Sequence, residues 1–241
     1  MPDAIYSHAR LAPVYDHFEA DRADLVPYAA LADQLDAREI IDLGCGTGCL
    51  ALTVAQPRRS VTAIDPARES LHVARSKIGA ERINWVEGDA TAIPPHLRAD
   101  LAMMTGNAAQ AVLTDEGWHN TLRHVHTALT PTGVFVFESR RPERHAWEEW
   151  ADPAPVTIRI PGIGEVERRL TLTRVALPLV SFRFTFRFLA EDTSLISDST
   201  IRFRSHDEIE ASLHAAGFIV RDVREAPDRP EQEFVFITSR S

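Results

Sequence analysis

Three glycines in five positions follow a strongly hydrophobic segment near residue 40. Residues 40–43 have the composition of a buried strand, and Gly44, Gly46 and Gly48 follow directly. Because glycine lacks a Cβ atom, the backbone can adopt positive φ and a ligand can lie against the peptide units. A helix predicted over residues 49–55 would point its free N–H groups at that ligand. The pattern predicts a nucleotide-sized binding site at the end of a strand.

The spacing of these glycines separates several classes of nucleotide site. A dinucleotide-binding turn reads G-x-G-x-x-G, whereas Cys49 occupies the position of its third glycine. A P-loop needs Gly-Lys-Ser/Thr, which the chain lacks. The turn is G-x-G-x-G with Asp42 in the preceding strand, and it resembles motif I of the class I S-adenosylmethionine-dependent methyltransferases.

A second strand, predicted over residues 61–65, ends on Asp65, 21 positions after Gly44. A carboxylate at that point can accept both ribose hydroxyls, and the alternative is a helix N-cap. Pro66 is predicted to take the first position of the next helix. That helix is expected to bury three residues at helical spacing, Leu71, Ala74 and Ile78.

The third strand, over residues 83–86, leads into Gly88, Asp89 and Ala90. The resemblance implies that Asp89 binds the adenine amino group; without it the segment would be an ordinary turn. The fourth strand, over residues 100–104, leads into Thr105, Gly106 and Asn107, where the family places its motif IV. Many relatives have an acid or an Asn-Pro-Pro-Tyr type sequence there, so Thr-Gly-Asn favours a small-molecule enzyme over a nucleic-acid base amine methylase.

The N-terminal residues 1–30 are predicted to form a helical lid rich in aromatic residues. Its segment Ala-Pro-Val-Tyr-Asp, residues 12–16, resembles the A-x-x-Y-D start of many small-molecule methyltransferases, which implies that Tyr15 touches the cofactor. The implied cofactor is S-adenosylmethionine. The cofactor contacts that the resemblance implies are Tyr15, Asp42, Gly44, Cys45, Gly46, Gly48, Asp65, Pro66, Gly88, Asp89, Ala90, Thr105, Gly106, Asn107 and Gln110.

The remaining core elements follow in family order. A helix is predicted over residues 115–129, a turn at 131–133 and a strand at 134–137, and a capping box at Ser205 and Glu208 opens a later helix. Strands at 218–223 and 233–237, joined by a loop over 226–231, end the chain. The fold class is therefore α/β, a Rossmann-like seven-stranded sheet with helices on both faces and its last strand antiparallel beside the fifth. The core is expected to comprise residues 31–140 and 205–241.

Residues 141–204 are predicted to form an inserted antiparallel sheet, because strand patterns at 156–160, 167–176, 180–189 and 195–204 follow one another without helices. Residues 182–188 alternate strictly, so four phenylalanines share one face, at positions 182, 184, 186 and 188. That face is expected to pack on the Rossmann core or across a two-fold axis, beside a cavity at Asn107 and Arg140. The insertion is thus a substrate cap or a dimer contact, in a monomer or homodimer.

Ligands of open α/β sheets bind outside the carboxyl ends of the strands. This places Glu138, Arg140, His145 and Trp147 as candidate acceptor-binding residues. Glu138 or His145 could act as a base, or each could be a structural hydrogen-bonding group. No residue is assigned as catalytic. The histidines and cysteines show no metal-ligand spacing, so no metal site is expected.

Composition limits the possible partners. The 241 residues carry a net charge of −9, which argues against a nucleic-acid partner. The start lacks the pattern of a signal peptide and no apolar run approaches a membrane span, so a cytoplasmic protein without membrane contact is expected. Cys45 and Cys49 are expected to be free thiols.

Three function classes remain. The leading hypothesis is a methyltransferase acting on an oxygen, nitrogen or carbon of a small metabolite. A nicotinamide-dependent oxidoreductase is disfavoured by Cys49 and by the lack of a Tyr-x-x-x-Lys pair. A catalytically silent S-adenosylmethionine-binding protein is disfavoured by the presence of both nucleotide acids and the full glycine turn.

Overall fold

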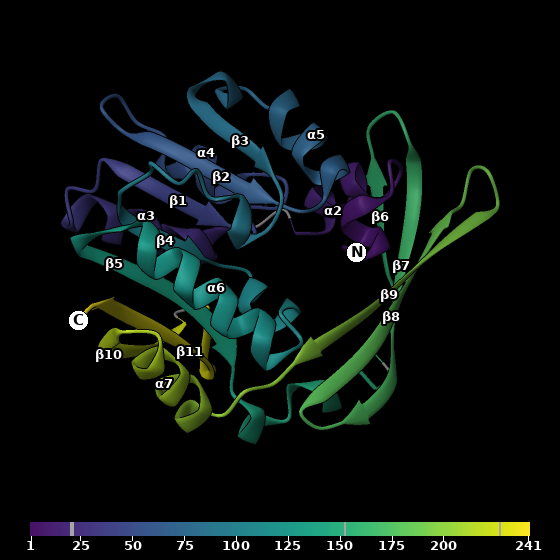
Figure 1. Cartoon of the computed structure of the whole chain (residues 1–241). Coiled ribbons are helices and arrows are strands. Elements are labelled where there is room, and N and C mark those ends of the chain that lie inside the picture. The colour runs from purple at the N-terminus through teal and green to yellow at the C-terminus, as the bar shows by residue number, and fades with distance from the viewer. Residues whose placement is uncertain (20–21, 152, 227) are drawn as a thin grey trace.

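The computed structural model describes residues 1–19, 22–151, 153–226 and 228–241. Its larger sheet has seven strands in the order β10-β11-β5-β4-β1-β2-β3 (Figure 1). The strands are β1 (Glu39–Leu43), β2 (Ser60–Asp65), β3 (Ile83–Glu87), β4 (Ala99–Met104), β5 (Leu129–Arg140), β10 (Phe218–Ala226) and β11 (Arg229–Arg240). β1 to β5 pair in parallel, and β11 lies antiparallel between β5 and β10. The predicted fold class is confirmed, including the antiparallel last strand beside the fifth.

Helices cover both faces of this sheet. Apolar side chains of α3 (Val26–Gln34), α4 (Cys49–Val54) and α5 (Arg68–Ser76) pack on one face. Those of α6 (Asp115–Ala128) and α7 (His206–Ala215) pack on the other. The short 3-10 helices are η1 (Ala23–Leu25), η2 (Ala80–Arg82), η3 (Ala90–Ala92), η4 (Ala108–Ala111), η5 (Pro142–Arg144) and η6 (Ala146–Glu148). This three-layer arrangement brings the glycine turn and the ends of β2 to β5 to one edge.

Several boundaries differ from the sequence prediction. Helix α5 begins at Arg68, so the prediction that Pro66 takes its first position was wrong; Pro66 lies in the bend before it. The same helix ends at Ser76, and Ile78 is 101% exposed instead of buried, because Gly79 adopts positive φ and turns the chain. Strand β5 begins at Leu129, where a turn at 131–133 was expected. Part of the loop predicted at 226–231 falls on residue 227, which lies outside the described residues.

A second sheet of four antiparallel strands lies in the order β6-β7-β8-β9. They are β6 (Val156–Ile160), β7 (Gly164–Ala176), β8 (Leu179–Phe188) and β9 (Thr193–Arg202). The N-terminal helices α1 (Ala4–Ser7) and α2 (Ala12–Phe18) lie between this small sheet and α5 (Figure 1). The inserted antiparallel sheet is therefore confirmed.

The phenylalanine stripe of β8 is covered by the N-terminal helices. Phe186 and Phe188 are fully buried among Leu11 and Val14, and Phe18 packs edge to face on Phe186 at 5.8 Å between ring centroids. The expectation that the stripe packs on the Rossmann core was wrong: α1 and α2 come between the sheet and the core. Phe182, farther along the stripe, contacts Trp150 instead, at 5.2 Å.

Replacing Phe186 by Ala should lower the free energy of unfolding by about 3–5 kcal/mol, the usual effect of emptying a buried aromatic site. Ile196→Ala, in β9 on the outer side of the same sheet, is the control, because Ile196 is half exposed. Denaturant titration followed by circular dichroism would measure both. Equal losses in the two variants would contradict the burial of the stripe.

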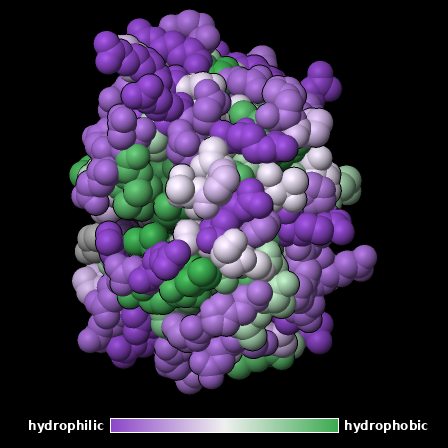
Figure 2. Space-filling model, turned by 60° about the vertical axis from the view of Figure 1, so that its left-hand side comes forward, coloured by the Kyte–Doolittle hydropathy of each residue, from purple (hydrophilic) through white to green (hydrophobic). Residues whose placement is uncertain are grey.

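The face of the molecule in Figure 2 is mainly hydrophilic, with hydrophobic side chains gathered in separate small patches. Among the described residues, no helix is long and apolar enough to cross a membrane.

Candidate cofactor and acceptor site

The three glycines of the turn have different surroundings although all have positive φ. A Cβ atom added at Gly44 would lie 2.7 Å from Cβ of Ala108, and one at Gly48 would lie 2.4 Å from the ring of Trp85. A Cβ at Gly46 would meet no atom within 4 Å. Gly44 and Gly48 therefore allow close packing within the protein, while Gly46 borders open space. A cofactor held against the turn would lie at Gly46.

Asp65 ends β2 and holds this turn in place. Its Oδ2 accepts the backbone N–H of Gly46 at 2.8 Å, and its Oδ1 accepts that of Ala67 at 2.7 Å. Burial raises the pKa of this carboxyl, while the two backbone hydrogen bonds oppose the rise. Each carboxylate oxygen can accept more than one hydrogen bond, so Asp65 retains capacity for ribose hydroxyls beside Gly46. Pro66 is exposed in the bend that follows.

Asp42 and Cys45 lie beneath the turn. Asp42 is fully buried in β1, and its Oδ2 has no hydrogen-bond partner among the described residues. Burial, together with the charge of Asp65, raises the pKa of Asp42 to about 7. Burial also raises the pKa of the Cys45 thiol well above its ordinary value. Neither side chain is placed to contact a ligand as openly as the backbone of Gly46.

The raised pKa of Asp42 implies a pH-dependent stability. Between about pH 4 and pH 7 the unfolded chain has lost this proton while the folded chain retains it, so the folded state becomes less stable as pH rises through that range. Asp42→Asn should remove this contribution, and should stabilise the protein more at pH 8 than at pH 4.5. Thermal melts of both proteins across this range measure it, and parallel profiles would contradict the burial argument.

Gly88, Asp89 and Ala90 lie at the end of β3, next to the end of β2, because Gly88 donates its N–H to the carbonyl of Asp65 at 3.0 Å. Asp89 is exposed and accepts both the backbone N–H and the hydroxyl of Thr91, at 2.9 and 2.6 Å. These bonds lower the pKa of Asp89. Ala90 is buried in η3. Asp89 forms the N-cap of η3. Because Gly88 pairs with Asp65, Asp89 lies at the same end of the sheet as Asp65.

Asp89→Ala should weaken S-adenosylhomocysteine binding less than truncation of Asp65 does. An adenine amine would donate one hydrogen bond to an exposed carboxylate, and an exposed charge keeps much of its solvation. Calorimetric titration of the two variants tests the order. A larger loss for Asp89→Ala would reverse the assignment of the two acids.

Two neighbouring residues with positive φ, Gly106 and Asn107, follow β4. A Cβ at Gly106 would meet nothing within 4 Å, as at Gly46. Asn107 is buried: its backbone N–H donates to Glu138 Oε1 at 3.0 Å and its Nδ2 to Glu233 Oε1 at 2.9 Å. Its Oδ1 has no partner among the described residues. Thr105 is half buried before them. This turn provides a second open backbone position at the edge of the sheet.

The other candidates at this end divide into two groups. Gln110 is buried and accepts from Arg140 Nη1 at 3.1 Å while its Nε2 donates to the carbonyl of Arg202 at 3.2 Å, so its amide faces β9 and not the glycine turn. Glu138 accepts the hydroxyl of Tyr28 as well as the N–H of Asn107. Burial raises the pKa of Glu138. Both side chains are fully engaged in the protein.

Glu233 joins these groups and was missed by the sequence prediction. It begins the residues of β11 that pair with β5, opposite Arg140. Its Oε1 lies 2.8 Å from Arg229 Nη1 and 3.8 Å from Arg140 Nε, in addition to Asn107. A charged residue at the start of a predicted antiparallel neighbour of the fifth strand was the available signal. The sequence could not show that Glu233 pairs with Asn107, which lies 126 positions earlier in the chain.

Arg140 lies beside Trp150, which packs together with Trp147 on Phe203, whereas His145 is exposed. The Arg140 guanidinium is 5.6 Å from the ring of Trp150. Trp147 is buried against Phe203 at 4.8 Å. The exposed His145 faces Glu148, with Nδ1 to Oε1 at 3.2 Å. Of the four predicted acceptor residues, Arg140 is thus the one with a partly exposed polar group next to Asn107.

Tyr15 lies in α2 and packs edge to face on Tyr6 of α1, with ring centroids 5.4 Å apart. Burial raises the pKa of Tyr15 to about 12 and that of Tyr6 well above its ordinary value, so both hydroxyls stay protonated at neutral pH. The charges that act on Tyr6 include both Arg140 and Asp65. Tyr6 therefore lies beside Tyr15 in the N-terminal segment.

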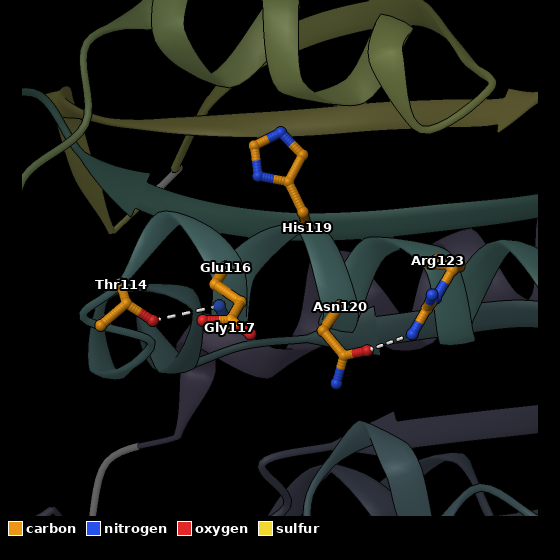
Figure 3. A pocket seen from close by; sticks show the side chains of 6 residues that line it. All are labelled: Thr114, Glu116, Gly117, His119, Asn120 and Arg123. Carbon is orange, nitrogen blue, oxygen red and sulfur yellow. Dashed lines mark hydrogen bonds between the residues drawn. The ribbon is translucent and has the colours of Figure 1, made fainter.

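A separate hollow lies on α6. Figure 3 shows it lined by the side chains of that helix and its N-cap, with Thr114 accepting the N–H of Gly117 and Arg123 donating to Asn120. A surface formed by a single helix, none of whose residues follows a strand end, has none of the convergent groups of the site above.

Among the described residues, no group of three histidine, cysteine or acidic side chains could hold a metal ion. The open part of the site is built from the backbone at Gly46 and Gly106, the acids Asp65 and Asp89, and Arg140 beside Trp150. Space at Gly46 beside a carboxylate that can accept ribose hydroxyls fits a nucleoside cofactor.

Comparison with known proteins agrees with this geometry. The Methyltransferase domain family matches residues 40–133, which span the glycine turn, both nucleotide acids and the Gly106 turn. Residues 40–133 thus form a methyltransferase domain of the class I S-adenosylmethionine-dependent type. The cofactor of this family is S-adenosylmethionine.

Curated relatives include the cypemycin N-terminal methyltransferase of a Streptomyces species, 29% identical over 50% of this chain and 49% of that protein. The malonyl-[acyl-carrier protein] O-methyltransferase of Pectobacterium atrosepticum is 31% identical over 53% and 49%. The chain spans at most about half the length of the curated relatives it matches.

Solved structures resemble the whole fold. DesVI of Streptomyces venezuelae has a TM-score of 0.78 at 20% identity, covering 95% of this chain and 98% of that one. CalS10, an amino pentose methyltransferase of Micromonospora echinaspora with bound S-adenosylmethionine, has a TM-score of 0.75 at 22% identity, covering 95% and 97%. These likenesses concern the fold, including the added small sheet.

Proposed function

We propose that this protein is an S-adenosylmethionine-dependent methyltransferase that moves a methyl group to an oxygen, nitrogen or carbon of a small metabolite by in-line displacement. The observation that carries the proposal is the pair of open glycines, Gly46 and Gly106, at the ends of neighbouring strands β1 and β4. Gly46 lies beside Asp65 and Gly106 beside Asn107. A cofactor along the first and an acceptor near the second would meet at the edge of the sheet.

In this proposal S-adenosylmethionine, when bound, supplies an electrophilic methyl group, and the chain supplies orientation. Holding two reactants in line can contribute about 7–11 kcal/mol to lowering a barrier. Asp65 would hold the ribose and Asp89 the adenine amine, while Tyr6 and Tyr15 would cover the cofactor as neutral side chains. Because α1 and α2 cover the site together with the small sheet, the reaction would proceed away from bulk water.

Glu138 is a poor candidate for a general base in this proposal. Both of its oxygens accept hydrogen bonds from the protein, from Tyr28 and from Asn107. His145 is exposed and packs its ring on that of Trp147, with ring centroids 5.0 Å apart. The acceptor atom would therefore either be unprotonated and nucleophilic when it binds, or lose its proton to another group of the acceptor molecule.

Residues 1–30 would act as the lid and 141–204 as the substrate cap. The acceptor would lie against the aromatic wall of Trp150 and Phe182, with its polar end at Arg140. The outer arginines of the sheet offer little to a nucleic acid, because Arg183 pairs with Asp198 at 2.6 Å and Arg187 with Asp192 at 2.8 Å. A small-molecule acceptor in the cytoplasm, for a monomer or homodimer, completes the proposal.

Calorimetric titration with S-adenosylmethionine, S-adenosylhomocysteine and NAD tests the cofactor assignment. We expect binding of the first two and none of NAD; binding of NAD alone would favour an oxidoreductase. A turnover screen with amines, phenols and amino sugars, scored by S-adenosylhomocysteine release, then separates an enzyme from a silent binding protein. No turnover with any class, despite cofactor binding, would favour the silent protein.

A further inference from the structure

The N-terminal helices form one body with the small sheet. The apolar residues that pack around Leu11 and Val14 come from residues 4–18 or from residues 158–195. The backbone N–H of Ile5 also donates to Ser197 Oγ of β9 at 2.8 Å, and Arg168 of β7 pairs with Glu19 at 2.7 Å. We call α1, α2 and the strands β6–β9 the cap. Its parts adhere to each other through buried apolar contacts and a buried hydrogen bond.

This cap covers the predicted cofactor groups. Asp65 is only 8% exposed and Thr47 of the glycine turn only 3% exposed. Helix α2 contacts this turn, since Asp16 accepts the hydroxyl of Thr47, and α1 and α2 both lie against α5 (Figure 1). Because Asp65 and Thr47 are so little exposed and α2 contacts the turn, the cofactor would enter and leave more easily when the cap separates from the core.

The joint between α1–α2 and the core is polar. Asp16 of α2 accepts a hydrogen bond from the hydroxyl of Thr47. It also forms an ion pair with Nζ of Lys77, the residue that follows α5, at 2.5 Å. Ser70 of α5 adds a hydrogen bond to the carbonyl of Tyr6 at 2.9 Å. Asp16 and Lys77 are each about three-quarters buried. One carboxylate thus ties the cap to the glycine turn and to the helix after Asp65.

Separating the cap from the core costs less free energy than separating α1 and α2 from the small sheet. Water can replace the partners of Asp16, Thr47 and Lys77, whereas separating α2 from the small sheet would expose fully buried side chains such as Phe186 and Val14. The cap would therefore part from the core as a body, breaking the contacts of Asp16 in α2 together with those of Arg202 in β9 to Gln110 and Asp115.

We propose that Asp16 is a positioning residue that latches the cap over bound S-adenosylmethionine. The latch rests on the cofactor-binding part of the proposed function. Asp16 touches the turn through Thr47, beside Gly46, so closing the latch also fixes the turn against which the cofactor lies. Loss of the latch should speed cofactor release more than it slows chemistry.

Asp16→Asn tests the latch, because it removes the charge that pairs with Lys77 and keeps the size of the side chain. Stopped-flow displacement of S-adenosylhomocysteine should show release about tenfold faster, the change expected for loss of a charge-assisted hydrogen bond. The matched control is Glu191→Gln, which breaks the ion pair of Arg10 and Glu191 inside the cap, at 2.9 Å, and should leave release unchanged. Melting temperatures of both variants would establish that they fold.

A second measurement needs no cofactor. Hydrogen exchange of the free protein should be faster over residues 4–18 in Asp16→Asn than in the unaltered chain, and unchanged over β1 to β5. Lys77→Met should produce the same release rate, and the double variant should add little to either, as for two partners of one contact.

The outcomes are distinguishable. Unchanged release in Asp16→Asn, an equal change in Glu191→Gln, or additive effects of Asp16→Asn and Lys77→Met would overturn the latch while leaving the proposed function intact. Failure of the unaltered chain to bind S-adenosylhomocysteine at all would overturn the proposed function and the latch together.

Discussion

Gly46→Val should abolish the binding of S-adenosylmethionine and S-adenosylhomocysteine while the protein remains folded. The added side chain enters the open space beside the turn, where the protein itself has no atom within 4 Å. The new side chain therefore excludes the ligand without disturbing the packing of the protein core. Calorimetric titration measures the loss, and circular dichroism with a melting curve measures the fold.

Backbone strain must be separated from this occlusion, because Gly46 has φ +53°, which a β-branched residue adopts at a cost of about 1–3 kcal/mol. Gly162→Val is the matched control. Gly162 also has positive φ, +76°, with nothing within 4 Å of its Cβ position, but it lies in the turn between β6 and β7. Similar melting temperatures with binding lost only in Gly46→Val are expected; normal binding by Gly46→Val would show that no ligand approaches the turn.

Asp65→Ala should weaken S-adenosylhomocysteine binding by at least about 1.5–3 kcal/mol, the contribution of a charge-assisted hydrogen bond. The loss of the carboxylate also leaves the N–H groups of Gly46 and Ala67 without this acceptor. The measured effect therefore includes a less well-held turn, and calorimetry alone does not isolate the ribose contact.

Comparing S-adenosylhomocysteine with its 2′-deoxyribose analogue isolates that contact. The unaltered protein should prefer the ligand with the hydroxyl, and Asp65→Ala should bind the two more nearly equally. A preference of the same size in both proteins would place the ribose hydroxyl elsewhere and reassign Asp65 as a support of the turn.

The order of the core and its strand ends could be predicted because they depend on local patterns. Gly44, Gly46 and Gly48 follow a hydrophobic run, and Asp65 ends the next one, so each site element lies within a few residues of a recognisable strand. The roles of the three glycines could not be divided from sequence, because the division depends on Ala108 and Trp85, which approach them from other elements.

Contacts between distant segments explain the remaining differences. The alternation of β8 predicted correctly that its phenylalanines share a covered face, but not that α2 covers it, since any apolar surface satisfies that requirement. Asp16 and Lys77 look like ordinary surface charges in the sequence, and only the placement of α2 over α5 brings them together. The same is true of Glu233 and Asn107.

The cap also has a consequence for how the chain folds. Its two pieces are far apart in sequence: the hydrogen bond between Ile5 and Ser197 spans 192 positions. Contacts of such long range lose much chain entropy on closing and form late unless an intervening structure first brings the ends together. The Rossmann core, whose parallel strands follow one another along the chain, supplies that structure. We therefore expect the nucleotide-binding edge to assemble before its cover, so that a folding chain passes through a state in which the cofactor has free access.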